Sequence, residues 1–185
     1  YRHTSSLFVI IWFMLCFSSY GLSTWINVLY ENIGLTNVYA SSFVYATASL
    51  PGYIFAINYL DQVGGKQNLL MWGLFAGGVS AIGFGLGTSI AGVVIVSSTL
   101  FNGFAVVCFC SLDVISLEAY PTNVRTTAMG VFTAVGKIGA VVAQFVNGEL
   151  EHHVPLLLFV TSCCMMIGSV ACWYLPRDKL PRAVS

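Results

Sequence analysis

Charge is what this sequence has least of. Of its 185 residues only 8% are Asp, Glu, Lys or Arg, whereas 57% are hydrophobic. The mean hydropathy of +0.84 is too high for a water-soluble domain of this size. The formal net charge is zero and no basic run is present, so nucleic acid is excluded as a partner. The composition instead places the chain in a lipid bilayer.

The motifs of the common enzyme classes are also missing. The sequence contains no Walker A segment, Rossmann glycine pattern, zinc-ligand spacing or nucleophile elbow. We therefore expect a protein that is not an enzyme, with no catalytic residue, no metal and no cofactor. His152 and His153, next to two glutamates, could bind a proton or a metal ion, but a solvated loop is the favoured interpretation. No Asn-x-Ser/Thr glycosylation site occurs either.

What the sequence does contain is long apolar runs, each close to the roughly 20 residues that cross a bilayer. There are six of them: Leu7–Leu29, Ala40–Leu60, Leu69–Gly87, Gly92–Leu117, Ala128–Gly148 and Val154–Leu175. All six cysteines fall inside these runs, where they act as small packing residues. Pro51 is expected to kink or break the second span. We predict an all-α fold, a polytopic six-helix membrane bundle formed by residues 1–185.

The positions of Lys and Arg predict how the bundle is oriented. The connections 30–39, 88–91 and 149–153 contain neither residue. The chain ends and the other connections do contain them, at Arg2, Lys66, Arg125, Arg177, Lys179 and Arg182. Because basic residues in short loops stay on the cytoplasmic side, both ends of the chain are expected to be cytoplasmic.

Two of these cytoplasmic connections carry an acid, a turn and a base. Asp61 and Lys66 flank a Gly-Gly turn in YLDQVGGKQNL, and Glu118 and Arg125 flank Tyr-Pro-Thr in SLEAYPTNVRTTAMG. Each pair alone could be a set of interfacial anchors. The two pairs together on one side of the membrane favour a cytoplasmic gate made of charged residues.

Asp113 and Lys137 are the two charges that lie inside apolar spans. A charge in the hydrocarbon region is costly unless it is paired or hydrated. Lys137 lies about 15 Å and Asp113 about 7 Å from the cytoplasmic edge, counted along their helices. Each of the two side chains leans toward the other, because side chains tilt toward the N-terminus of their own helix. We predict that they approach each other and face a polar cavity; an inert structural ion pair is the alternative.

Aromatic residues of the first span are further candidates for this cavity. Trp12 and Tyr20 are eight residues apart and therefore lie close to one helix face. Small-molecule sites have mostly apolar walls with a few polar groups, which suits such a face. Packing against neighbouring helices is an equally good interpretation of these two rings.

These segments resemble the carboxyl-terminal half of a major facilitator superfamily transporter. Residues 61–66 resemble its D-x-x-G-R-K/R element, with Gly65 in place of the usual Arg, and residues 118–125 match its E-x-Y-P-T-x-x-R element. Within the superfamily, YGLSTW, LPG, LDVISLEAYPTNVRTTAMG and the context of Lys137 are most similar to the synaptic vesicle glycoprotein 2 family.

The resemblance implies a set of cavity residues. Trp12, Tyr20, Asp113 and Lys137 would line the central cavity of the transporter. Phe109 and Thr133 would occupy cavity positions at which that family typically has Trp and Asn. A ligand in this superfamily binds between two six-helix bundles, so the resemblance also implies an amino-terminal bundle as a partner.

The expected function is secondary active transport of a small organic solute, a sugar or an organic ion, by alternating access. The partners would be that solute, the lipid bilayer and the amino-terminal bundle, in the plasma membrane or an intracellular vesicle membrane. The alternative is a transporter-like vesicle-membrane regulator or ligand-binding protein without turnover. A six-span channel is disfavoured because every connection is too short for a pore loop.

Overall fold

All regular elements in the described part of the chain are α-helices. The computed structural model describes residues 2–35, 37–60, 65–87, 90–151 and 153–175. The helices are α1 (Arg2–Ile33), α2 (Val38–Thr47), α3 (Ser49–Leu60), α4 (Gly65–Leu86), α5 (Ala91–Glu118), α6 (Thr122–Leu150) and α7 (Val154–Trp173). With α2 and α3 taken as one span, six segments of these ranges are long and apolar enough to cross a membrane. The predicted all-α, six-helix bundle is therefore confirmed.

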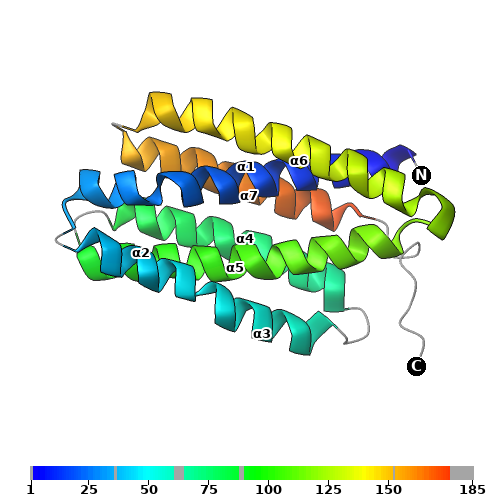
Figure 1. Cartoon of the computed structure of the whole chain (residues 1–185), viewed down its shortest axis with the longest axis horizontal. Coiled ribbons are helices and arrows are strands. Elements are labelled where there is room, and N and C mark those ends of the chain that lie inside the picture. Colours follow the sequence, from blue (N-terminus) through cyan, green and yellow to red (C-terminus); the bar gives the residue numbers. More distant parts are fainter. Residues whose placement is uncertain (1, 36, 61–64, 88–89, 152, 176–185) are drawn as a thin grey trace.

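The helices run side by side along the long axis of the molecule (Figure 1). The start of α1 and the end of α7 lie at the same end of the bundle. Helix α1 packs mainly on α6 and α7, and α4 packs mainly on α5 and α7. Consecutive helices α5 and α6 have few contacts with each other, because α1 lies between them. Side chains of α1, α5 and α6 can therefore meet on one face of the bundle.

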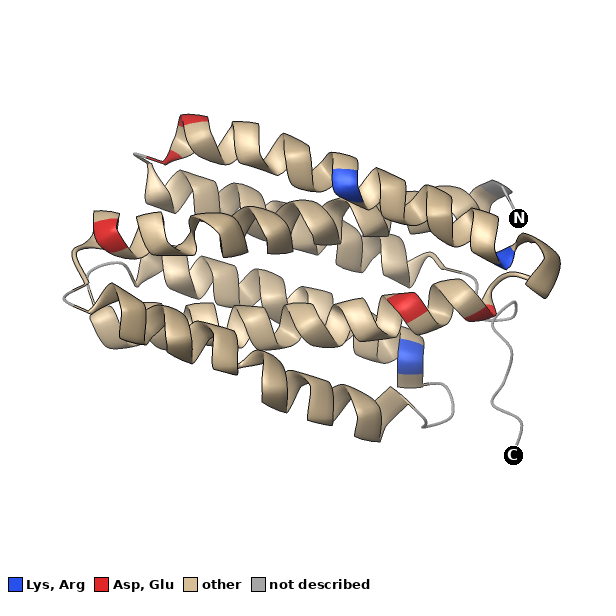
Figure 2. Cartoon of the chain, viewed as in Figure 1, with Lys and Arg blue, Asp and Glu red and all other residues tan. Residues whose placement is uncertain are grey.

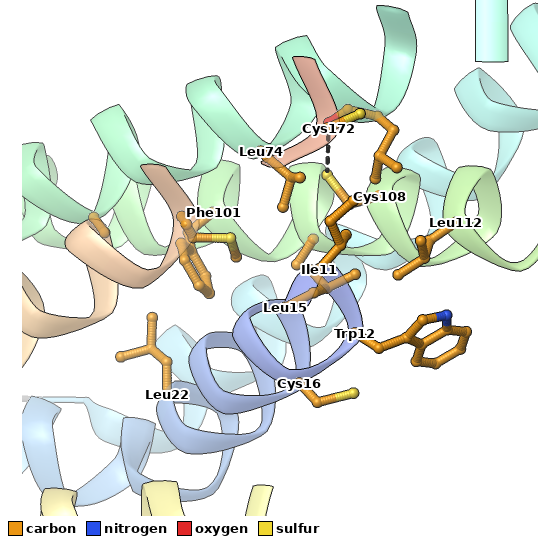
Figure 3. Close-up of a cluster of buried hydrophobic side chains, with 14 of the residues drawn as sticks. Ile11, Trp12, Leu15, Cys16, Leu22, Leu74, Phe101, Cys108, Leu112 and Cys172 are labelled. Atoms are coloured by element: carbon orange, nitrogen blue, oxygen red, sulfur yellow. Dashed lines mark hydrogen bonds between the residues drawn. The ribbon is translucent and has the colours of Figure 1, made fainter. Parts of the chain in front are cut away.

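The core is formed where α1, α4, α5 and α7 meet (Figure 3). Its members are buried and mostly branched or aromatic, and the fully buried ones include Ile11, Leu15, Leu22, Leu74, Phe101, Cys108, Leu112 and Cys172. The thiol of Cys108 is 3.8 Å from the backbone carbonyl of Leu70. No disulfide joins the six cysteines, all of which belong to the described residues. The cysteines therefore pack as small apolar residues, as the sequence predicted.

The second span breaks where Pro51 was expected to disturb it. The break lies at Ala48, three residues before Pro51, because proline has no amide hydrogen and its ring clashes with the carbonyl four residues earlier. The Asn102 side chain of α5 donates a hydrogen bond of 2.7 Å to the Tyr45 carbonyl at the end of α2. A methyl group at Gly52 would lie 2.9 Å from the Gly103 carbonyl oxygen, so the broken span packs directly on α5.

Acidic residues lie at both ends of the bundle, whereas the basic residues outside the middle of α6 lie at one end (Figure 2). Glu31, Glu149 and Glu151 lie where α1 and α6 end, whereas basic residues are found at the opposite end. Such an excess of basic residues at one end is what the positive-inside rule describes. That this end is cytoplasmic stays a prediction. Between these two ends the described helices carry almost no charge, which makes Asp113 and Lys137 conspicuous.

Candidate functional site

Three helices contribute predicted site residues to one face. Tyr20 lies eight residues after Trp12 on α1, Asp113 four after Phe109 on α5, and Lys137 four after Thr133 on α6. Residues four or eight apart lie along one side of a helix. Each helix therefore presents its predicted residues as a stripe, and α1 carries the central one.

Lys137 rests on an aromatic ring. Its Nζ atom is 4.9 Å from the centroid of the Tyr20 ring, within the range of a cation–π interaction. Tyr20 in turn contacts Phe109, with ring centroids 5.8 Å apart and planes tilted by 56°. Lys137 is exposed in this chain and Tyr20 is 41% exposed. The ammonium, the phenol ring and the phenyl ring thus form a continuous surface contributed by α6, α1 and α5.

Asp113 lies on the same face but makes no ion pair with Lys137. Among the described residues the Asp113 carboxylate has no basic nitrogen within 4.0 Å, and it is partly buried on α5. A methyl group at Gly136 of α6 would lie 2.7 Å from the sulfur of Cys16, which is buried on α1, so α1 and α6 are in direct contact here. Asp113 and Lys137 thus lie on two helices that both pack on α1, and they are not joined.

The remaining two predicted cavity residues have partners within the bundle. Trp12 is 5% exposed, and its indole N–H donates a hydrogen bond of 3.1 Å to the Ser116 hydroxyl of α5. Figure 3 shows its ring at the edge of the core cluster. Thr133 is exposed, and its hydroxyl donates to the Met129 carbonyl of its own helix at 2.8 Å. Their contact with a solute stays a prediction.

At the end of the bundle where α5 finishes, two of the four predicted gate residues form an ion pair. Lys66 Nζ is 2.5 Å from Glu118 Oε1, and the two side chains are 23% and 31% exposed. This pair joins the start of α4 to the end of α5 and so connects the two acid-turn-base loops. Arg125 instead donates from Nε to the Tyr120 carbonyl at 3.3 Å. Asp61 lies outside the described residues.

Tyr120 is a residue that the sequence interpretation missed. It was treated as part of a turn, but it is only 8% exposed and packs on Phe8 of α1 and Phe132 of α6. Its hydroxyl is 2.7 Å from the Ser5 hydroxyl of α1. The signal available in the sequence was an aromatic residue directly before a helix-stopping proline, a position where turn residues are usually polar.

Curated proteins of similar sequence are membrane transporters and their relatives. The niacin transporter NiaP of Acinetobacter baylyi is 30% identical over 148 residues, which cover 79% of this chain and 33% of that protein. Human synaptic vesicle glycoproteins 2C and 2B are 30% and 31% identical, each over 77% of this chain and over 19% and 21% of the respective protein. The chain thus spans no more than 33% of the length of these relatives. No protein-family model matches it.

Proposed function

The chain belongs to the major facilitator superfamily, and we propose that it is one six-helix half of a secondary active transporter of a small organic solute. The chain is an integral multi-pass membrane protein. In this proposal it is the carboxyl-terminal half, both of its ends are cytoplasmic, and an amino-terminal bundle covers the face formed by α1, α5 and α6.

The observation that carries the proposal is the exposed ammonium of Lys137 in the middle of α6. Its contact is the Tyr20 ring, and no described carboxylate lies within 4.0 Å of it. Against lipid, such a charge would cost about 3 kcal/mol or more. That cost disappears if the face borders a hydrated cavity between two bundles, which is where transporters of this architecture bind their solutes.

The ion pair between Lys66 and Glu118 supports a second part of the mechanism. It connects α4 to α5 at the proposed cytoplasmic end, and the α5–α6 connection that follows is anchored on α1 through Tyr120. In alternating access one bundle rocks against the other around a central site. We propose that this connected end moves as one unit and closes the cavity toward the cytoplasm.

The test is concentrative uptake into proteoliposomes by the full-length protein with both bundles. We expect Asp113→Asn and Lys137→Met each to abolish uptake while membrane insertion and yield stay normal. Ile138→Met is a matched control, because Ile138 is the exposed apolar neighbour of Lys137. Uptake that survives both charge substitutions would contradict the proposal. Solute binding without any uptake would favour the alternative, a ligand-binding membrane regulator.

A further inference from the structure

Two opposite charges that form no ion pair with a described residue share the site face. Within the described part of the chain, neither the Asp113 carboxylate nor the Lys137 ammonium makes an ion pair or accepts or donates a hydrogen bond to another side chain. The distance between the two groups exceeds 4.0 Å. Lys137 is exposed and Asp113 partly buried on this face, so each charge is accessible to a ligand that brings a counter-charge.

The surface between these two charges is apolar and mostly aromatic. Tyr20 lies under the ammonium and contacts Phe109, and Phe109 precedes Asp113 by one helical turn, about 6 Å along α5. Gly136, the residue before Lys137, packs on Cys16 of α1, and a methyl group there would lie 2.7 Å from the Cys16 sulfur. Along the face the order is therefore ammonium, two aromatic rings, carboxylate.

Charge balance limits which solutes this arrangement accepts well. An anion at Lys137 would leave the Asp113 carboxylate uncompensated and would be repelled by it, and a cation at Asp113 would meet the opposite problem. An uncharged sugar would compensate neither group. A solute with one positive and one negative group compensates both, and the part of the occupied site that this chain contributes is then neutral, which matters most where the surroundings are apolar.

We propose that the transported solute is a small zwitterion with a flat apolar body, and this inference rests on the proposed transport function. Its anionic group lies at Lys137, its cationic group at Asp113, and its body covers the rings of Tyr20 and Phe109. Flat bodies suit this surface because aromatic rings bind one another in offset or tilted arrangements.

Two sets of matched compounds test the charge requirement. In the first, the pyridine ring is constant: N-methylnicotinate is a zwitterion, nicotinate an anion and 1-methylnicotinamide a cation. In the second, 4-(aminomethyl)benzoate is a zwitterion, its N-acetyl derivative an anion and its methyl ester a cation, with a longer separation of charges. Competition binding to the full-length protein in nanodiscs measures the affinity of each compound.

In at least one set we expect the zwitterion to bind at least tenfold more tightly than the anion and the cation of the same set. Lys137→Met should shift the preference to the cation of that set, and Asp113→Asn should shift it to the anion. Ile138→Met should leave the order unchanged. Opposite shifts in two variants that differ by single charges cannot arise from general misfolding.

The outcomes separate this inference from the proposed function. If the anion or the cation of both sets binds as tightly as the zwitterion, or if the two variants keep the native order, the zwitterion class is wrong even where uptake of another solute proves transport. If the zwitterion binds with the expected shifts but is not taken up, transport is wrong and the ligand class stands.

Discussion

The two charged regions of this bundle differ in how their charges are paired. At the end where α5 finishes, Lys66 and Glu118 form an ion pair and Tyr120 anchors the next connection on α1. On the face formed by α1, α5 and α6, the charges of Lys137 and Asp113 stay apart, and an aromatic ring is the closest partner of the ammonium. The paired charges hold helices together, whereas the charges without an ion pair among the described residues are the ones that we propose to contact the solute. The distinction gives four predictions.

The largest effect is expected for Lys137→Met. If the ammonium binds a group of the solute, its removal should cost about 3 kcal/mol of binding free energy, or more than a 100-fold loss of affinity. Equilibrium binding to the full-length protein measures this loss. Thermal unfolding should be unchanged or slightly improved, since no protein carboxylate loses a partner. A large loss of stability with little loss of solute affinity would show that Lys137, like Lys66, holds helices together and does not bind the solute.

The next largest effect is expected for Tyr120→Ala, and it should be on stability. This substitution removes a ring that packs on Phe8 and Phe132 and leaves a cavity, for about 2 to 3 kcal/mol. Tyr120→Phe keeps the ring and loses the hydroxyl that lies 2.7 Å from Ser5, for about 1 kcal/mol. Unfolding in detergent should rank native, Phe and Ala in that order. If the affinity for the solute falls by as much free energy as the stability, the two regions are not separate in function.

A smaller effect is expected for Tyr20→Leu. The substitution keeps an apolar side chain but removes the ring beneath Lys137, so it should cost about 1 kcal/mol of affinity, or roughly fivefold. Tyr20→Phe retains the ring face and is the matched control, with affinity close to native. Equal losses in both variants would show that the hydroxyl, and not the ring, contributes to binding.

The smallest effect is expected from the Lys66 and Glu118 pair. Both side chains are partly exposed, so the ion pair should contribute about 1 kcal/mol or less. Glu118→Lys alone should increase labelling of a cysteine placed in the cavity by a reagent added from the cytoplasmic side. The double variant Lys66→Glu with Glu118→Lys should restore native labelling. Identical labelling of the native protein, the single variant and the double variant would show that Lys66 and Glu118 are not part of the gate.

The fold was predictable because hydrophobic length is a local property. Each apolar run became helix, and Pro51 disrupted the second span as its missing amide hydrogen requires. The packing of the broken span was not predictable, because it depends on contacts with Gly103 and Asn102 of α5. Helix periodicity thus predicts which elements form, but the helix that packs against a broken span comes from a distant part of the chain.

The site was predictable only as a set of stripes. Depth along the helix and side-chain tilt predicted that Asp113 and Lys137 approach each other, but they did not reveal that α1 separates α5 from α6, so the contact of Lys137 with Tyr20 was missed. In the same way, Lys66 was expected next to Asp61 across a turn, and the structure pairs it with Glu118, 52 residues away. Trp12 was grouped with Tyr20 by spacing alone, yet its indole N–H donates a hydrogen bond to the Ser116 hydroxyl within the bundle. Distances between helices depend on packing, which periodicity does not encode.

The position of α1 between α5 and α6 has a consequence for how the protein is made. Within this half of the protein α1 is synthesised before the other helices, but its main neighbours, α6 and α7, follow all the others. Until α7 has inserted, the Ser18 hydroxyl lacks the Thr161 carbonyl to which it donates, and the side of α1 that packs on α7 stays uncovered. Biogenesis of this half should therefore pass through a long-lived, incompletely assembled intermediate, and truncation after α5 should yield a chain that membrane quality control removes.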